Sequence, residues 1–304
     1  MSTPAVFVFG ATGNIGSAVI RELLPDHQAG RLKLIAAVRR PEAASGFESQ
    51  GMETRLIDLD RAEMEGLAPV VDAMRGANRV FLLTGYDVKM LAQSKAAIDA
   101  AKIVGASHMV HIGANARPDT TAVHTGWHQL VEAYIERSGI GFTHLRPSQF
   151  MQTLPMLYGM AGRPSVIENY IADARIGWID AGDIAAVAGA ALRDPSAHAA
   201  QTYSLATDLA SMDEIAAMLS KVTGAPWRYQ AREPDVFYEK VTAAGADAVY
   251  MGCVRNVFAR TRDGSLPELC EVYDNVRSLT VREPTSLLTF IERNRAAFES
   301  APAQ

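Results

Sequence analysis

The chain has 304 residues, 48% of them hydrophobic and 21% charged, and its net charge is −5. This composition is ordinary for a soluble globular protein, and the chain lacks the basic field that nucleic-acid binding requires. The two cysteines, Cys253 and Cys270, are too few for a disulfide framework and fit a reducing compartment. The longest apolar stretch, 184–192, is shorter than the ~20 residues of a membrane span, and the N-terminus has no basic signal region. We therefore expect a cytoplasmic protein without a signal peptide.

The first 25 residues follow the order strand, glycine turn, helix. The run 5–9 is apolar, the segment 10–16 contains three glycines at three-residue spacing, and 17–24 is amphipathic. Such a turn lets the backbone approach phosphates, and the helix N-terminus supplies unpaired N–H groups and a positive dipole end. The alternative is an ordinary glycine-rich turn between a strand and a helix. We expect the turn to hold a dinucleotide pyrophosphate through Gly10, Thr12, Gly13, Asn14, Ile15 and Gly16.

Strand-like and helix-like segments alternate through the first half of the chain. Further strands are predicted at 32–39, 54–58, 79–84, 109–113 and 142–146, and helices at 66–75, 89–104 and 127–138. This alternation predicts βαβ units, a parallel sheet and right-handed crossovers.

The second half of the chain changes character. Short strands are predicted at 177–180, 201–205 and 227–230, and helices at 181–192, 211–221, 237–244, 246–260, 268–279 and 285–298. The fold class that these patterns predict is α/β: a Rossmann-type, doubly wound parallel sheet with a smaller, mostly helical C-terminal lobe. We expect residues 1–150 to form the NADP-binding domain, completed by strands near 177–180 and 201–206. Residues 151–304 then form the substrate lobe.

The end of the second strand indicates which nucleotide is bound. An acidic residue there selects NAD, whereas an arginine pairs with the 2′-phosphate of NADP. Residues 38–41 read Val-Arg-Arg-Pro, without an acid, so we predict NADP(H) as the cofactor, with Arg39 as the main contact. The alternative is that Arg39 and Arg40 are solvated surface charges.

Two further strand ends are expected to border the nucleotide. Asp58, followed by Leu59, stands where a carboxylate can accept a hydrogen bond from the adenine amino group; a turn-forming role for Asp58 is the alternative. Thr84 and Gly85 end the fourth strand, where small residues let the backbone pass beneath the ribose and diphosphate.

The segment from Trp127 to Gln152 makes the chain recognisable. It carries His128, Glu132, Ser138-Gly139, Thr143, Leu145-Arg146-Pro147 and Phe150-Met151-Gln152. With the glycine turn, this pattern resembles the NmrA-like family of atypical short-chain dehydrogenase/reductases, and most closely its bacterial NADPH-dependent quinone and triphenylmethane-dye reductases. The resemblance extends from the N-terminus to about Tyr203. The family also contains non-catalytic NADP sensors.

The resemblance also exposes a departure from ordinary short-chain dehydrogenases, which use a Tyr-x-x-x-Lys pair and a serine. The tyrosine position falls on His124, the lysine position on His128, and residues 112–114 have no hydroxyl. On one helix the two histidines share a face, so one can hydrogen-bond the nicotinamide ribose while the other donates a proton. Alternatively, His128 only positions the ribose and His124 is a loop residue near solvent. No metal site is expected, because no third ligand accompanies the pair.

The resemblance implies the remaining site residues. Gly113, Pro147 and Phe150 are expected to border the nicotinamide. The acceptor is expected to contact Tyr86, Trp127, Phe150 and Met151, although aromatic residues and methionines of this kind also form ordinary core. His111 is expected to be a core histidine.

The function expected from these features is NADPH-dependent hydride transfer to a conjugated or aromatic acceptor: a quinone, an enone, a dye or a polyketide-like metabolite. Such acceptors stabilise their own negative charge, so the missing tyrosine and lysine are tolerated. The alternative function is a non-catalytic NADP(H) redox sensor that binds a protein partner. Otherwise the expected partner is the small-molecule substrate, without nucleic acid or membrane, and the protein is expected to be a monomer or homodimer.

Overall fold

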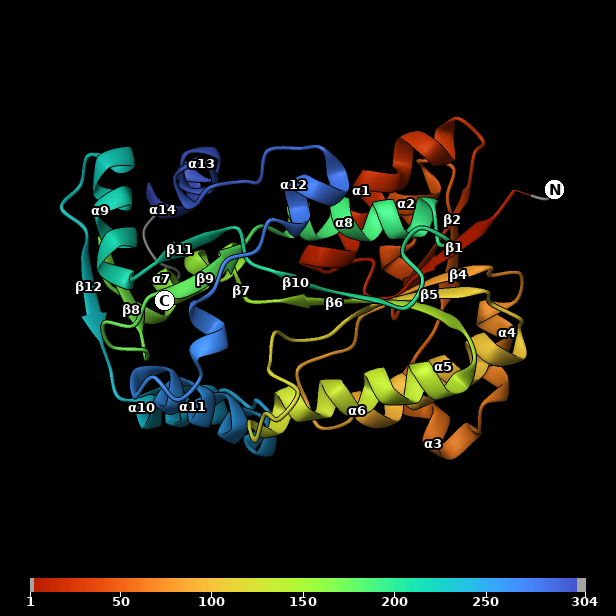
Figure 1. Cartoon of the computed structure of the whole chain (residues 1–304), viewed down its shortest axis with the longest axis horizontal. Helices are drawn as coiled ribbons and strands as arrows, with labels where there is room; N and C mark the ends of the chain where they lie inside the picture. Colours follow the sequence, from red (N-terminus) through yellow and green to blue (C-terminus); the bar gives the residue numbers. More distant parts are fainter. Residues whose placement is uncertain (1–2, 300–304) are drawn as a thin grey trace. The chain divides into compact units, whose positions relative to one another are not determined.

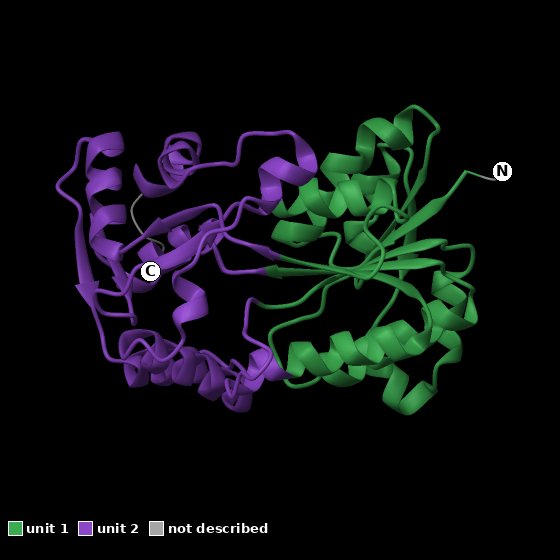
Figure 2. Cartoon of the chain, viewed as in Figure 1, with its two compact units in different colours: residues 1–114, 127–146, 184–203 green, residues 115–126, 147–183, 204–304 purple. Residues whose placement is uncertain are grey.

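The computed structural model describes residues 3–299, which form two compact units (Figure 2). The chain passes from one unit to the other several times. Of the described residues, unit 1 comprises 3–114, 127–146 and 184–203, and unit 2 comprises 115–126, 147–183 and 204–299.

Unit 1 is built on a seven-stranded sheet in the order β10-β6-β5-β4-β1-β2-β3 (Figure 1). Its strands are β1 Ala5–Val8, β2 Lys33–Val38, β3 Glu53–Leu56, β4 Arg79–Leu82, β5 His108–Ile112, β6 Gly141–Pro147 and β10 Gln201–Leu205. Strands β1 to β6 pair in parallel. The chain adds β2 and β3 on one side of β1 and β4, β5 and β6 on the other. The strand order therefore reverses between β1 and β4, where ligands bind in open α/β sheets.

Helices cover both faces of this sheet, with α1 and α8 on one face and α4, α5 and α6 on the other (Figure 1). The helices associated with unit 1 are α1 Asn14–Gln28, α2 Ser45–Glu48, α3 Ala62–Glu65, α4 Ala68–Met74, α5 Met90–Ile103, α6 Val123–Ser138 and α8 Ala181–Arg193, with 3₁₀ turns η1 Pro41–Ala43 and η2 Leu59–Arg61. All four side chains of β1 are buried, as expected of a central parallel strand. The predicted Rossmann-type fold is confirmed.

Unit 2 contains two small sheets, β11-β9-β7 and β12-β8. Their strands are β7 Gln149–Phe150, β8 Val166–Asn169, β9 Ile176–Ile179, β11 Asp208–Ala210 and β12 Arg228–Ala231. The helices of unit 2 are α7 Leu154–Ala161, α9 Met212–Thr223, α10 Pro234–Ala243, α11 Ala248–Arg262, α12 Asn275–Thr280, α13 Leu287–Arg293 and α14 Arg295–Glu299, with 3₁₀ turns η3 Met151–Thr153 and η4 Pro267–Cys270.

The core of unit 2 forms around aromatic side chains. Trp178 of β9 is fully buried among apolar residues, and the ring of Trp227 lies 4.7 Å from that of Tyr158 and 6.0 Å from that of Phe298. This core corrects one expectation: β9 was predicted to complete the main sheet, but it pairs with β7 and β11. A four-residue apolar strand is suited to either sheet, and its pairing partners determine where it lies.

Two predicted helices of unit 2 are also interrupted. The range 268–279 contains η4, an extended stretch and then α12, because Pro267 starts a short 3₁₀ turn. The range 285–298 is divided at Asn294, whose side-chain amide donates to the Phe290 carbonyl oxygen and caps α13.

Strand β8 was not predicted, because it contains the charged residue Glu168, which is buried in the structure. Glu168 is 1% exposed and accepts hydrogen bonds from Arg232 at 3.0 Å, Lys240 at 2.6 Å and the Tyr170 hydroxyl at 3.1 Å. A buried carboxylate is tolerated when it is paired in this way. Within residues 3–299, no helix has the length and hydrophobicity that crossing a membrane requires.

Candidate functional site

The glycine turn lies at the carboxyl end of β1, where the strand order reverses. Gly10 has a φ of +64°, and its carbonyl oxygen accepts a hydrogen bond from the Gly13 amide at 2.9 Å. A Cβ atom on Gly16 would lie 2.1 Å from that same oxygen. Gly10 is therefore required because its φ is positive, and Gly16 is required because a side chain there would collide with the Gly10 carbonyl oxygen.

The start of α1 remains available to a ligand. Gly13 occupies the N-cap position, and among the residues that the structure describes no side chain caps the helix there. Thr12, Gly13 and Asn14 are exposed, whereas the Ile15 side chain is buried. Ile15 can thus offer only its backbone. The exposed residues of the turn, which include the small polar side chains of Thr12 and Asn14, lie at a helix N-terminus, which is a favourable position for an anion.

The end of β4 meets the glycine turn. A Cβ on Gly10 would lie 3.3 Å from the Leu83 side chain, and the chain then continues through the half-buried Thr84 and the exposed Gly85. This places the predicted residues of both strand ends at the same edge of the sheet. Tyr86 follows with 65% of its surface exposed, so it is available for ligand contact.

An acid that follows β3 lies near the end of β2. Arg39, directly after β2, is exposed, and Asp60, the second residue of η2, is close enough to interact with its charge. Asp60 accepts hydrogen bonds from Gln93 at 2.7 Å and Lys89 at 3.3 Å. The Gln93 hydrogen bond, then Lys89 and the charge of Arg39, lower the pKa of the Asp60 carboxyl group. The sequence analysis missed this group, although Asp60 stands only two residues after Asp58.

Asp58 has the turn-forming role that was the alternative to a contact with adenine. Its carboxylate accepts a hydrogen bond from the Asp60 amide at 3.0 Å and caps η2, where Leu59 is the first residue. One carboxylate oxygen is thereby engaged in local structure, which leaves the other for a ligand.

Helix α6 carries both candidate catalytic histidines. It begins at Val123, four residues earlier than predicted, so His124 and His128 lie one turn apart on the same helix. In unit 2, the His124 ring lies 5.6 Å from the ring of Tyr250, and burial lowers the His124 pKa to about 4. In unit 1, the ring of His128 lies 6.0 Å from that of His111. A pKa of about 4 corresponds to a neutral His124 imidazole at neutral pH.

A buried ion pair supports the end of β5. Both carboxylate oxygens of Glu132 on α6 bind Arg146 on β6, at 3.0 and 2.5 Å. A Cβ on Gly113 would lie 2.7 Å from the Glu132 carboxylate, so the glycine makes room for the pair. Glu132 and Arg146 both belong to the segment that carries the family pattern, but their pairing across 14 residues was not predicted.

The same region places His111, Glu132 and His144 with ligand atoms within 4.8 Å of one another. All three are buried, and burial, followed by neighbouring charges, lowers the pKa of both histidines, that of His144 to about 4. Neutral imidazoles are metal ligands, yet Arg146 already occupies both Glu132 oxygens and places a cation beside the cluster. The donor set therefore does not fit a metal ion.

The residues predicted beyond β6 lie in unit 2. Pro147 ends β6, and its carbonyl oxygen accepts a hydrogen bond from the Asn115 amide at 3.1 Å. Phe150, like Trp127 of unit 1, is half-buried, which leaves ring surface for contact. Met151 is fully buried in the core of unit 2, as the core alternative expects.

Asn115 is a residue that the sequence analysis missed. Its side-chain amide lies within hydrogen-bond distance of the Ser148 hydroxyl at 3.1 Å, the Glu268 carbonyl oxygen at 2.9 Å and the Tyr273 hydroxyl at 3.3 Å. It joins three segments of unit 2 that are up to 158 residues apart in the sequence. No local pattern could have indicated this role.

The fold and the glycine turn define a Rossmann-type α/β protein, and comparison with known proteins identifies its family. The model of the NmrA-like family matches residues 2–271, and the chain belongs to this family. It is 31% identical to the NAD(P)H azoreductase of Xenophilus azovorans over 97% of this chain and 100% of that protein.

Solved structures share the fold at lower identity. The Escherichia coli NADPH-dependent quinone oxidoreductase complexed with NADPH aligns with a TM-score of 0.78 at 22% identity, covering 96% of this chain and 99% of that one. NmrA, a negative transcriptional regulator solved with NAD, aligns with a TM-score of 0.73 at 16% identity, covering 99% and 96%.

Proposed function

We propose that this protein is an NADPH-dependent reductase that transfers hydride to an acceptor able to stabilise its own negative charge, such as a quinone, an azo compound or another conjugated dye. The observation that carries the proposal is the glycine turn, in which Gly16 lies too close to the Gly10 carbonyl oxygen for any side chain, and in which no side chain of the described residues caps the start of α1. The relationship to an NAD(P)H azoreductase over nearly the whole chain supports the same activity.

The histidines support this class of acceptor. Because burial keeps His124 neutral, strong acid catalysis is not expected from that position. Quinones and azo compounds need little acid catalysis, since their conjugated systems take up the negative charge and solvent can supply the proton. Hydride transfer from the bound nicotinamide then depends mainly on proximity and orientation.

The test is turnover. The full chain is incubated with NADPH and, separately, a naphthoquinone, an azo dye and a triphenylmethane dye, and the fall in NADPH absorbance is followed. We expect turnover of at least one acceptor. Tight NADPH binding without turnover of any of them contradicts the reductase function.

The second candidate function is an NADP(H) sensor. The histidines that replace the tyrosine and lysine favour it, as does the structural likeness to the regulator NmrA. A sensor must distinguish NADP⁺ from NADPH, so the two dissociation constants are compared by calorimetry. Equal affinities for the two forms would contradict this candidate.

A further inference from the structure

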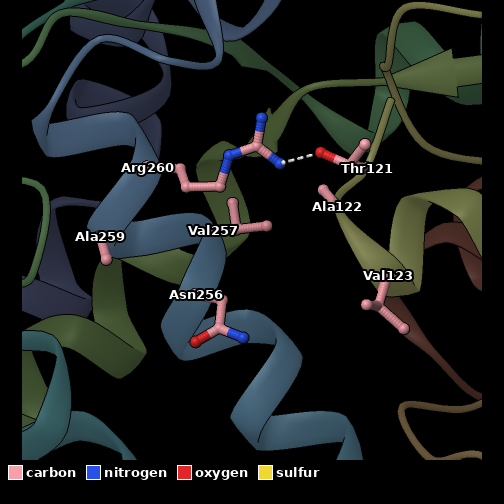
Figure 3. Close-up of a pocket in the computed structure, with 7 residues that line it drawn as sticks. All are labelled: Thr121, Ala122, Val123, Asn256, Val257, Ala259 and Arg260. Carbon is pink, nitrogen blue, oxygen red and sulfur yellow. Dashed lines mark hydrogen bonds between the residues drawn. The ribbon is translucent and has the colours of Figure 1, made fainter. Parts of the chain in front are cut away.

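Unit 2 contains a pocket that the proposed hydride-transfer chemistry does not require. It lies between the start of α6 and one face of α11, and its volume is about 380 Å³ (Figure 3). Thr121, Ala122 and Val123 form one wall, and Asn256, Val257, Ala259 and Arg260 form the other. This volume is within the range of about 300–1,000 Å³ in which small-molecule sites fall.

The pocket has a cation in its lining. Arg260 is the charged residue among its described lining residues, which include no carboxylate. The guanidinium donates to the Thr121 hydroxyl at 3.1 Å, to the Ser265 hydroxyl at 3.2 Å and to the Ser265 carbonyl oxygen at 3.3 Å. These bonds involve three of its five N–H groups and hold the side chain in place. Figure 3 shows the guanidinium pointing from α11 toward Thr121.

The remaining walls combine apolar and polar groups. Val123 and Val257 present methyl groups, and Asn256 adds an amide at the opposite end from Arg260 (Figure 3). The nearby acid, Asp263, does not line the pocket; its carboxylate is held by Ser265, and its pKa is lowered mainly by those hydrogen bonds and less by the charge of Arg260. An anchored cation beside apolar walls suits an aromatic ring that carries an anionic group.

We propose that this pocket binds the sulfonate or carboxylate group of an aromatic ligand through Arg260. That this ligand is the hydride acceptor rests on the proposed reductase function. Val123 is the first residue of α6, and the next residue of that helix, also in unit 2, is the candidate catalytic residue His124. Arg260 is thus a specificity-determining residue that favours anionic over neutral aromatic acceptors.

The first experiment measures binding by calorimetry, with the full chain in the presence and absence of NADP⁺. The probes are naphthalene-2-sulfonate, naphthalene-2-carboxylate and the neutral naphthalene-2-sulfonamide. In the Arg260→Gln variant we expect the dissociation constant of at least one anion to rise about tenfold and that of the sulfonamide to change less than about twofold. Arg260→Lys keeps the charge but loses the planar fork, so it should restore part of the affinity.

The matched control is Arg277→Gln. Arg277 is an arginine of α12 in the same unit that forms an exposed ion pair with Glu283 at 2.6 Å, and it does not line the pocket. This variant should bind all three probes as the wild type does. Equal weakening by Arg277→Gln and Arg260→Gln, or unchanged anion binding in Arg260→Gln, overturns the proposal.

The second experiment measures turnover of 1,4-naphthoquinone and 1,4-naphthoquinone-2-sulfonate. In Arg260→Gln the KM of the sulfonated quinone should rise about tenfold, with kcat and the neutral quinone unchanged. If quinones are reduced but anion binding does not depend on Arg260, the subsite is refuted and the reductase function stands. If no quinone is reduced but the anions bind through Arg260, the reductase function is refuted and the anion site stands.

Discussion

At the scale of single residues, the glycines of the first turn have separate tasks. Gly10 supplies a positive φ, and Gly16 supplies the absence of a side chain beside the Gly10 carbonyl oxygen. A Cβ on Gly13 would lie 3.4 Å from that oxygen, which is ordinary contact. The sequence pattern identified all three, but only the coordinates distinguish the position where any side chain is excluded.

Gly16→Ala tests this distinction. Because the added Cβ meets backbone atoms at 2.1 Å, the turn must shift, and we expect NADPH affinity to fall at least about tenfold and stability to fall by about 1–3 kcal/mol. Fluorescence titration and urea unfolding measure these effects. The control is Gly46→Ala, where a Cβ would meet nothing within 4 Å. Equal behaviour of the two variants would show that the close approach does not matter.

Arg39 is the residue expected to select the cofactor. It is exposed directly after β2, and the nearby Asp60 carboxylate interacts with the same positive charge that would bind the 2′-phosphate. In Arg39→Ala we expect the dissociation constant of NADPH to rise about tenfold and that of NADH to stay unchanged, because only NADPH carries the 2′-phosphate. Calorimetry with both cofactors checks this, with Arg40→Ala as the neighbouring control. Tighter binding of NADH than of NADPH by the wild type would refute the selection of NADP(H).

At the scale of elements, a buried charge pair connects α6 to β6. Glu132 is 3% exposed, and both its oxygens bind Arg146, so removing one partner leaves an uncompensated charge. Salt bridges in other parts of unit 1, such as Arg75 with Asp72, are exposed and contribute little. The pair holds the helix that carries His128 against the strand that leads to Pro147.

Glu132→Gln is expected to lower the free energy of unfolding by about 3 kcal/mol, because Arg146 is left without its carboxylate in a largely buried position. Asp72→Asn breaks an exposed pair and should cost less than about 1 kcal/mol. Urea unfolding compares the two variants. If Glu132→Gln were as stable as Asp72→Asn, the buried pair would have no structural role.

At the scale of the whole molecule, buried histidines dominate the expected response to acid. Burial lowers the pKa of His108, His124 and His144 to about 4, and that of His111 is also well below its usual value. In the unfolded chain these groups take up protons near pH 6.5, so stability falls as the pH decreases from about 6.5 toward about 4. Burial raises the pKa of Asp183 to about 6, which stabilises the folded chain on acidification over about pH 6 to 4 and partly opposes this loss.

The balance predicts lower stability at about pH 5 than at about pH 7, since four histidines outweigh one aspartate. His144 stacks on Phe142 with ring centroids 4.6 Å apart, so His144→Phe keeps an aromatic ring while removing the titration. We expect this variant to lose about 2 kcal/mol less than the wild type over that pH interval. Urea unfolding at both pH values measures the difference, and an unchanged difference would contradict the histidine contribution.

Local order explains which elements could be predicted. Strand β1, the glycine turn and α1 follow one another within 28 residues, and the capping box at Ser211 and Glu214 opens α9 as its spacing indicates. The alternation of strands and helices likewise determined the parallel sheet, because short crossovers permit few other topologies. Errors arose where a short apolar segment had two possible sheets, as for β9, or where a buried charge depended on distant partners, as for Glu168.

By itself, the amino-acid sequence determined the Rossmann-type sheet, the family and the edge at which a dinucleotide would bind, because each rests on neighbouring residues and on their periodicity. Only the tertiary structure determined which residues from distant segments are in contact. Thr121 and Arg260 are 139 residues apart, yet their hydrogen bond spans the pocket proposed for an anionic group. The hydrophobic periodicity of the sequence does not indicate such a contact, because the contact forms only when packing brings the two segments of unit 2 together.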